Sequence, residues 1–552
     1  MRPSPKFLDR LRRDASDLEN HVVDEFLAGR LDRRGLLREG SRFGLALPLI
    51  GGLLGAAPGG NRALAQAGQR DATIRIASPT PAGAVEPVSV ANPGGLLLLM
   101  QTGEFLVFDQ PDLVLRPMLA LSWKANEDGT VWTFKLRPDV TFHNGHVLNA
   151  ADVVATMDRL ADPKNGSNAL SAFRGVLSVG GTRKVDDLTV AFHLDAPNGN
   201  FPYLVSSDNY NAIILPADYA GDFEKTFIGT GPFKLEKYTA KVGASFVRNP
   251  DYWGIKALPV RTEFSFFTDQ QSQILALQGA QVDIVSQVTV QGAQGLLSNP
   301  DVKIVKVRAA IHRQLHMRTD LPTFADKRVR QAIAMTLDRP ALVAGLFRGL
   351  AEPGNDSPFA PVYPSTDPAV PQRKKDIPAA HALMVAAGVP NGFEATLTTE
   401  RLQEVPDYAV LVQNACREIG VKLNLKIETD AAYYGKAQPG QSDWLDSEMG
   451  ITDYGHRGVP NVLLGAPLLS GGAWNAAHFS NPAYDALVAQ YIATTDLGKQ
   501  REAAGKIQAL LLDETPVIFA YFYNFLTATA ANVGGLTVTA IPQLFLANAT
   551  IS

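Results

Sequence analysis

The amino-acid sequence predicts a mixed α/β fold. Apolar and polar residues alternate in several segments of the first half, such as residues 71–77 (DATIRIA) and 130–136 (TVWTFKL), and this alternation is typical of half-buried strands. Between residues 320 and 430, segments with the helical spacing of apolar residues alternate with strand patterns. No internal repeat is visible, which argues against a solenoid.

The first half of the predicted fold contains three strands and one clear helix. The strands are expected over residues 71–77, 130–136 and 185–194. The helix begins at Ala150 in the sequence ADVVATMDRLAD, where Asn149 or Asp152 supplies the polar residue expected near a helix N-terminus.

The second half is predicted to be mainly helical. Helical patterns cover residues 329–346, with an interruption at Pro340, and residues 408–419 and 483–512. A strand is expected over residues 421–427 (VKLNLKI).

Composition excludes several classes of protein. The chain has 552 residues, of which 46% are hydrophobic and 19% are charged, so it is neither disordered nor collagen-like nor a coiled coil. The net charge of −4 argues against nucleic acid as the main partner. Cys416 is the single cysteine, which excludes a disulfide scaffold and a multi-cysteine metal site.

Residues 1–67 are predicted to be an N-terminal extension and export signal. Arg33 and Arg34 precede an uncharged apolar stretch, and small residues with cleavage positions at Ala65 and Ala67 follow it. A basic region, a short apolar core and an A-x-A site are typical of a cleaved secretory signal. The arginine pair resembles the twin-arginine export signal, which implies the twin-arginine translocase as a partner during export.

The mature protein is expected to be soluble in the periplasm. No cysteine follows the apolar core directly, so a lipid anchor at the cleavage site is not expected. No later segment is long and apolar enough to span a membrane.

The sequence predicts no catalytic residues, no metal and no cofactor. Motifs for phosphate loops, serine hydrolases, zinc proteases and dinucleotides are absent. His143 and His146 lie on a predicted turn without a partner ligand, and His312 and His316 share one face of a predicted strand, where packing is expected. Cys416 lies in a helical pattern and is expected to be buried.

Several motifs follow one another after the predicted signal. They are RPMLALSW (116–123), TFKLRPDVTFHNGHVLNAADVV (133–154), GTGPFKL (229–235), RNPDYWG (248–254), VRQAIAMTLDR (329–339), AGVPNGFEATL (387–397) and HFSNPAYDALV (478–488). In this order they resemble the solute-binding proteins of peptide/nickel-type ABC transporters, called solute-binding family 5. The resemblance covers essentially the whole mature chain and is specific for the family, though not for the ligand.

The resemblance implies a periplasmic-binding-protein fold of type II, with a hinge between two lobes and an extra subdomain in the first lobe. Ligand is enclosed between the lobes in this family. The expected parts are lobe one (68–105, 215–312 and 516–552), the extra subdomain (106–214) and lobe two (313–515). The aromatic residues Trp132, Phe134 and Phe142 of the motifs are expected in the core.

The resemblance also implies a ligand-binding aspartate. Peptide-binding members often place an aspartate of lobe two on the ligand's amino group, within G-W-x-x-D-x-x-D-P. Here the stretch is GITDYGHR (450–457), in which Asp453 matches the first acidic position, Ile451 replaces the tryptophan, and the later Asp-Pro is lost. Asp453 is therefore predicted to bind a ligand amine or cation, with a hydrogen-bonding turn residue as the alternative.

Three basic residues favour a ligand with an anionic part. Arg318 stands where the family usually has asparagine, near the expected entrance to lobe two. Its guanidinium can form a planar fork to a ligand carboxylate, with a structural salt bridge as the alternative. His456 and Arg457 lead to the same interpretation.

Five further residues are candidates for ligand contact because of their position in the family pattern. Trp474, Trp444, Tyr433 and Tyr434 fall in the part of lobe two that usually faces the cleft, and core packing is the alternative for each. Glu104 falls where the family often has a cleft-facing glutamate.

The implied function is that of the extracytoplasmic substrate-binding component of an ABC importer, which as a monomer captures a short peptide or similar zwitterion. It would deliver this solute to permease subunits in the inner membrane. The altered 450–457 stretch supports an alternative with the same fold and another ligand: an opine, a sugar derivative, a metal chelate or an anionic metabolite. An exported hydrolase is a remote alternative, because no nucleophile, base and orienting group are recognisable together.

Overall fold

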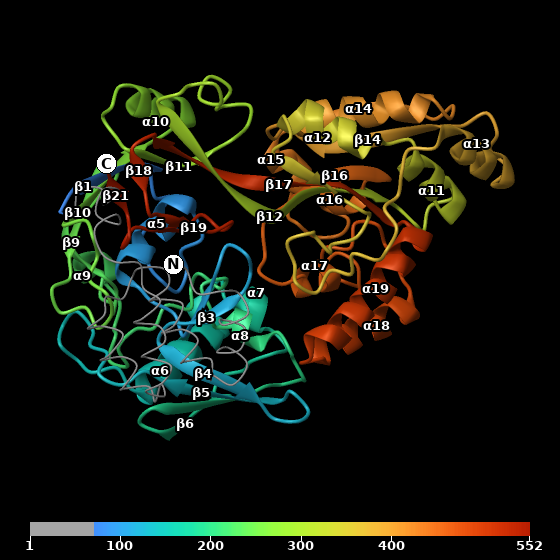
Figure 1. Cartoon of the computed structure of the whole chain (residues 1–552). Helices are drawn as coiled ribbons and strands as arrows, with labels where there is room; N and C mark the ends of the chain where they lie inside the picture. Colours follow the sequence, from blue (N-terminus) through green and yellow to red (C-terminus); the bar gives the residue numbers. More distant parts are fainter. Residues whose placement is uncertain (1–70) are drawn as a thin grey trace, which may run out of the picture.

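The computed structural model describes residues 71–552 (Figure 1). The predicted export signal, with Arg33, Arg34, Ala65 and Ala67, lies outside the described residues.

The described residues form two lobes that are joined by two long antiparallel strands, β12 (Val302–Met317) and β17 (Val517–Ala530) (Figure 1). An 11-stranded sheet passes through both lobes in the order β15-β14-β16-β12-β17-β11-β1-β10-β9-β8, with β13 also paired to β17. The register of β12 against β17 shifts between Val307 and Ile311 and again between His312 and Gln314. This irregular segment lies where the sheet leaves lobe one, so the predicted two-lobed α/β fold is confirmed.

Lobe one is built on a mixed part of the sheet. β1 lies between two parallel neighbours, β10 and β11, while β9 and β8 extend the edge in antiparallel pairs. The residue bounds are β1 (Thr73–Pro79), β8 (Phe233–Thr239), β9 (Gly243–Arg248), β10 (Arg261–Phe267), β11 (Ile284–Val288), α5 (Pro93–Thr102), α9 (Phe223–Thr226) and α10 (Gln270–Gln278). The chain ends in this lobe with the short strands β18 (Val533–Gly534), β19 (Thr537–Val538), β20 (Leu544–Phe545) and β21 (Thr550–Ile551).

The extra subdomain carries its own four-stranded antiparallel sheet in the order β4-β5-β7-β6. Trp132, Phe134 and Phe142 are buried in its core, as predicted. Its elements are β2 (Val107–Asp109), β3 (Leu115–Pro117), β4 (Ala120–Ala125), β5 (Val131–Leu136), α6 (Ala150–Ala161), the 3-10 helix η2 (Pro163–Asn165), α7 (Leu170–Phe173), β6 (Thr182–Asp186), β7 (Thr189–His193) and α8 (Phe201–Leu204). Helix α6 begins with a capping box formed by Asn149 and Asp152, which explains why its N-terminus was predictable.

Lobe two surrounds the other end of the sheet with helices (Figure 1). Its strands are β13 (Ala351–Pro353), β14 (Glu394–Glu400), β15 (Lys422–Glu428) and β16 (Met449–Tyr454). Its helices are α11 (Lys327–Met335), α12 (Arg339–Phe347), α13 (Ile377–Ala386), α14 (Val405–Arg417), α15 (Asp430–Tyr434), α16 (Asp443–Asp446), α17 (Asn461–Gly465), α18 (Pro482–Ala493) and α19 (Leu497–Glu514).

The extra subdomain also contacts lobe two directly. The Gly199 N–H donates to the Ile492 carbonyl at 2.8 Å. The side chain of Asn200 donates to Asn461 at 2.8 Å and accepts from Gln500 at 3.0 Å. Gly199 must be glycine here, because a Cβ would lie 1.9 Å from the Thr494 carbonyl oxygen.

Two of the predicted elements are wrong in detail. Residues 185–194 were expected as one strand, but a tight turn divides them between β6 and β7, because Asp186 accepts from the Leu188 N–H and closes a hairpin. The helix expected over 483–512 is two helices, α18 and α19, with Asp496 capping the second. The interruption expected at Pro340 is confirmed as the start of α12.

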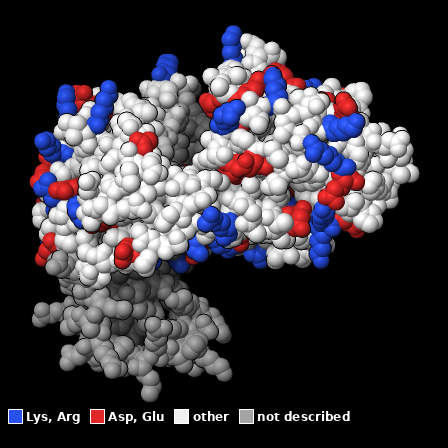
Figure 2. Space-filling view, turned by 90° about the horizontal axis from the view of Figure 1, so that it is seen from above, with Lys and Arg blue, Asp and Glu red and all other residues white. Residues whose placement is uncertain are grey.

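Charged side chains of both signs are interspersed over the face seen in Figure 2. Within residues 71–552, no helix combines the length and the apolar character needed to cross a bilayer. Cys416 is buried, as predicted, and burial raises the pKa of its thiol to about 12.

Candidate functional site

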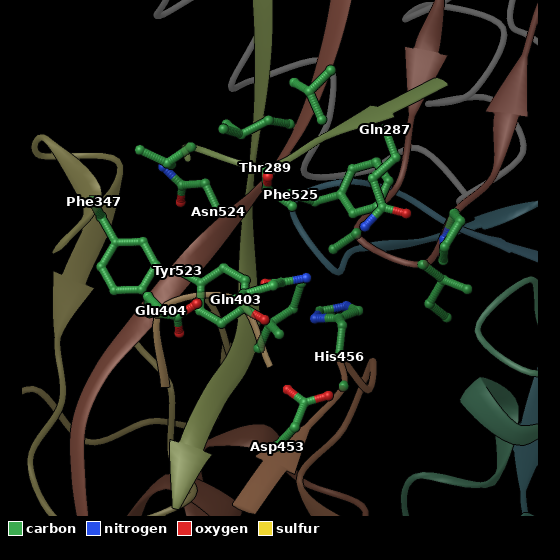
Figure 3. A pocket seen from close by; sticks show the side chains of 18 of the residues that line it. Gln287, Thr289, Phe347, Gln403, Glu404, Asp453, His456, Tyr523, Asn524 and Phe525 are labelled. Atoms are coloured by element: carbon green, nitrogen blue, oxygen red, sulfur yellow. The ribbon is translucent and has the colours of Figure 1, made fainter. Parts of the chain in front are cut away.

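A pocket of about 270 Å³ lies between the two lobes, beside the segment where β12 and β17 pass from one lobe to the other (Figure 3). Its lining from lobe one consists of Ala91, Leu96, residues 287–291, Ile311, residues 523–526 and residues 540–542. The extra subdomain adds Tyr210, and lobe two adds Phe347, Gln403, Glu404, Asp453 and residues 455–457. Because both lobes contribute walls, any change in the angle between them changes this pocket.

Arg313, on β12, organises one end of the pocket. Its side chain is fully buried, and its Nε lies 2.9 Å from Glu404 Oε1. Its Nη2 donates to Glu404 and Gln403, each at 3.2 Å. Its Nη1 donates to Asp453 and, at 2.8 Å, to the hydroxyl of Tyr523. One guanidinium thus holds two carboxylates, and the cluster has an excess of negative charge when all three groups are ionised.

Aromatic packing and backbone geometry fix the position of this cluster. The Arg313 guanidinium lies 4.9 Å from the ring centroid of Tyr523, and Phe347 stacks on the same tyrosine at 5.2 Å. Gln403 has φ of 43°, an uncommon conformation for a residue other than glycine, which directs its amide to Arg313. The groups that face the pocket at this end are therefore held in place before any ligand arrives.

His456 and Arg457 also line the pocket. Burial, with Arg457 adding to it, lowers the pKa of His456 to about 3, so its imidazole is neutral at physiological pH. The His456 Nδ1 accepts from the Ala310 N–H at 3.0 Å, which leaves the ring proton on Nε2. The Arg457 Nη1 donates to the His456 carbonyl at 2.9 Å, and no carboxylate of the described residues lies within ion-pair distance of this guanidinium.

The structure brings three of the predicted ligand residues, Asp453, His456 and Arg457, to the pocket lining. Asp453 differs from the expectation in one respect, because Arg313 already supplies its positive partner. Arg318 does not line the pocket. It forms a fork with Asp320 at 2.7 and 2.8 Å, so the salt-bridge alternative is the one that the structure shows.

Glu104, which was expected to face the cleft, does not line the pocket either. Its buried carboxylate accepts from the Tyr252 hydroxyl at 2.6 Å, from Trp253 Nε1 at 2.7 Å and from the Thr230 hydroxyl at 2.7 Å. These three donors belong to the GTGPFKL and RNPDYWG motifs, so Glu104 connects the two motifs inside lobe one.

Replacing Glu104 with glutamine is expected to alter the pH dependence of stability. Burial raises the pKa of Glu104 to about 6, although its hydrogen bonds act in the opposite direction. The folded state therefore binds this proton more tightly than the unfolded state, so the stabilisation is complete below about pH 4.5 and is lost as the pH rises through about 6. Relative to Glu104→Gln, the wild type should lose about 2 kcal/mol between about pH 4 and pH 7 in urea unfolding. A difference that stays constant with pH would contradict the assignment.

The four predicted aromatic residues of lobe two pack against one another outside the pocket lining. Tyr433, Tyr434, Trp444 and Trp474 share one apolar cluster, in which the Tyr434 ring lies 5.2 Å from Tyr433 and 5.3 Å from Trp444. The hydroxyl of Tyr434 donates to Glu400 at 3.0 Å. The core-packing alternative therefore describes their positions, because their rings contact each other instead of the cavity.

Sequence reasoning missed most of the pocket. Arg313, Gln403, Glu404 and Tyr523 were not predicted, although an arginine inside the apolar strand sequence AAIHRQLHM was a usable signal. A charge in the middle of a buried strand requires a partner of opposite sign. Acidic residues at the ends of neighbouring strands are therefore candidate partners of this arginine.

Comparison with known families agrees with this geometry. Residues 114–459, more than half of the chain, match the family described as "Bacterial extracellular solute-binding proteins, family 5 Middle". The chain belongs to this family.

Similar family 5 proteins come from several bacteria. The chain is 25% identical over 465 residues to the glutathione-binding protein GsiB of Pectobacterium atrosepticum, covering 78% of this chain and 84% of that protein. It is 26% identical over 436 residues to heme-binding protein A of Haemophilus influenzae, covering 73% and 78%. The solved structure of HbpA2 from Haemophilus parasuis has a TM-score of 0.77 at 22% identity and covers 87% of this chain and 100% of that one, which supports the same two-lobed fold.

Proposed function

We propose that this family 5 protein is the extracytoplasmic solute-binding component of an ABC importer and that it captures a short peptide or peptide-like zwitterion. The observation that carries the proposal is a pocket walled by both lobes at the strands that connect them. Rotation of the lobes about these strands would enclose a solute, and the closed form would deliver it to the permease.

The polarity of the pocket suits a zwitterion with amide groups. Among the described residues no carboxylate lies within ion-pair distance of the Arg457 guanidinium, and its planar donors match a ligand carboxylate. Gln287, Gln403 and Asn524 add side-chain amides to the lining, and these can both donate to and accept from peptide bonds (Figure 3). A related protein named for glutathione, itself a peptide, supports this solute class.

A second candidate is a non-peptide ligand on the same fold, such as an opine, a sugar derivative, a metal chelate or an anionic metabolite. The pairing of Asp453 with Arg313 favours it, because the carboxylate expected to bind a peptide amine is already neutralised. Heme-binding protein A, a relative of similar identity, shows that relatives of this chain are not confined to peptides.

We propose export through the twin-arginine translocase, release as a soluble periplasmic monomer, and docking on permease subunits of the inner membrane. The apolar stretch after Arg33 and Arg34, with small residues behind it, supports the export route.

The experiment that tests the function is identification of small molecules that co-purify with the protein, by mass spectrometry, followed by thermal shift with glutathione and trialanine. A bound solute should raise the melting temperature in a concentration-dependent way. Arg457→Met is expected to weaken trialanine binding by about tenfold or more, because it removes the partner of the ligand carboxylate. Arg318→Met is the matched control and should bind as the wild type does, since Arg318 pairs with Asp320 outside the pocket.

Two results would contradict this proposal. The first is a preparation from which no small molecule is released and which none of the peptides stabilises. The second is equal loss of binding in Arg318→Met and Arg457→Met, since that pattern would indicate a general effect of arginine removal.

A further inference from the structure

A second and much smaller void, of about 10 Å³, borders the main pocket. His456, Ala540 and Ile541 line both spaces. The small void is about the size that one water molecule or one ammonium group occupies. Asp109 and Asp208, both from the extra subdomain, also line it.

Asp109 brings an unsatisfied carboxylate oxygen to this void. The residue ends β2 and is 5% exposed, and its Oδ1 finds no hydrogen-bond partner among residues 71–552. The Asp109 N–H donates to the hydroxyl of Ser207 at 2.8 Å, which fixes the backbone. A buried acceptor without a donor is costly, so a donor that enters the void would stabilise this carboxylate.

Asp208 converges on the same place from the other side. Its Oδ1 accepts from the backbone N–H of Gly458, in lobe two, at 2.6 Å. A Cβ on Gly458 would lie 2.7 Å from Asp109 Oδ2 and 2.7 Å from Asp208 Cγ. Glycine at position 458 thus lets the two carboxylates and the lobe-two backbone approach one another closely.

Burial disfavours the ionised form of both carboxyl groups at this place. Burial raises the pKa of Asp109 well above its ordinary value, and the neighbouring Asp208 and Asp112 raise it further. Burial also raises the pKa of Asp208 to about 6, although Arg457 and the Gly458 N–H act against it. Arg457 thus offsets only part of the effect of burial, and a further positive group in the void would favour the ionised form of the pair.

We propose that Asp109 and Asp208 form the subsite for a protonated primary amine of the captured solute, whose remaining atoms occupy the main pocket. This inference rests on the proposed function. It assigns the amine to a place other than Asp453, which Arg313 already neutralises. The three N–H donors of an ammonium group match the unpartnered Asp109 Oδ1 and the adjoining Asp208 carboxylate.

A metal ion fits the same place less well. Within the described part of the chain, no group of three or more His, Cys, Asp or Glu side chains could hold one. Calcium takes about six to eight oxygen ligands, more than two aspartates supply in so small a space. A free ammonium ion has the same chemistry as a solute amine, and the experiment separates these two sources.

Isothermal titration calorimetry with trialanine and N-acetyl-trialanine tests the inference, because the two probes share length and carboxylate and differ in the amine. The wild type is expected to bind trialanine about tenfold or more tightly than the acetylated probe. Asp109→Asn and Asp208→Asn should each lose this preference, with the affinity for N-acetyl-trialanine unchanged within about threefold. Asp453→Asn changes the main pocket but not the subsite, so the ratio of the two affinities should stay as in the wild type even where both affinities change.

Several outcomes would overturn the inference. One is a preference that survives in Asp109→Asn and Asp208→Asn but disappears in Asp453→Asn. Another is a wild type that binds both probes equally or binds neither. A melting temperature raised more by ammonium chloride than by sodium chloride, without a preference for trialanine, would assign the void to a free cation. A co-purifying solute that lacks an amine would remove the subsite and leave the proposed importer function intact.

Discussion

Replacing Arg313 with methionine is expected to lower the free energy of unfolding by about 3–5 kcal/mol, because it leaves Glu404 and Asp453 without their shared counterion. Glu404 is 1% exposed and cannot turn to solvent. Methionine approximates the length of the arginine stem, so the loss should reflect the charge and its hydrogen bonds more than an empty space. Urea unfolding followed by far-UV circular dichroism would measure the change.

Arg308→Met provides the control on the same strand. Arg308 pairs with Glu352, but its side chain is 53% exposed, so water screens the pair and the expected cost is about 0.2–1 kcal/mol. Equal effects of the two substitutions would mean that the Arg313 cluster is no more important than a surface pair. The Arg313 variant should also lose solute binding at the pocket, since four of its partners line that space.

Replacing Asp356 with asparagine is expected to cost a similar amount, about 3–5 kcal/mol, in lobe two. The buried Asp356 carboxylate accepts from Arg339 Nη2 at 2.7 and 2.8 Å and lies 3.0 Å from Arg373 Nη1. The substitution keeps the shape but removes the charge that two arginines share. Asp356 has φ of 51°, which asparagine tolerates well, so backbone strain should not contribute.

Asp222→Asn is the matched control for Asp356→Asn. Asp222 also has a left-handed backbone, with φ of 60°, and it forms an ion pair with Lys225. Both partners are about three-quarters exposed, so the expected change in unfolding free energy is within about 0.5 kcal/mol. A loss at position 222 as large as that at 356 would attribute the effect to the backbone and not to the buried charge.

The elements of the fold were largely predictable because their signals are local. The helix that starts at Ala150 follows from apolar spacing and from the Asn149 cap within a few residues. The same locality explains the errors. Alternation continues through the turn at Asp186 and Leu188, so one strand was expected where a hairpin lies.

The composition of the pocket was less predictable because it depends on contacts between distant segments. Arg313 binds residues that lie 90 to 210 positions away in the sequence. Its strand is central in the sheet and buried on both faces, so the side-chain pattern could not distinguish a residue beside the pocket from one in the core. By contrast, the salt bridge of Arg318 is formed with Asp320, which lies only two residues away in the sequence.

The pairing of β12 with β17 also affects how the chain can fold. The two strands join residues 302–317 to residues 517–530, with all of lobe two between them in the sequence. Closing such a long loop is slow compared with forming local helices, and topologies rich in distant contacts fold slowly. Each lobe can begin to organise its own layers early, but the shared sheet forms only after residue 517 and those that follow have been synthesised. The connection between the lobes is therefore expected to be among the last parts of the molecule to assemble.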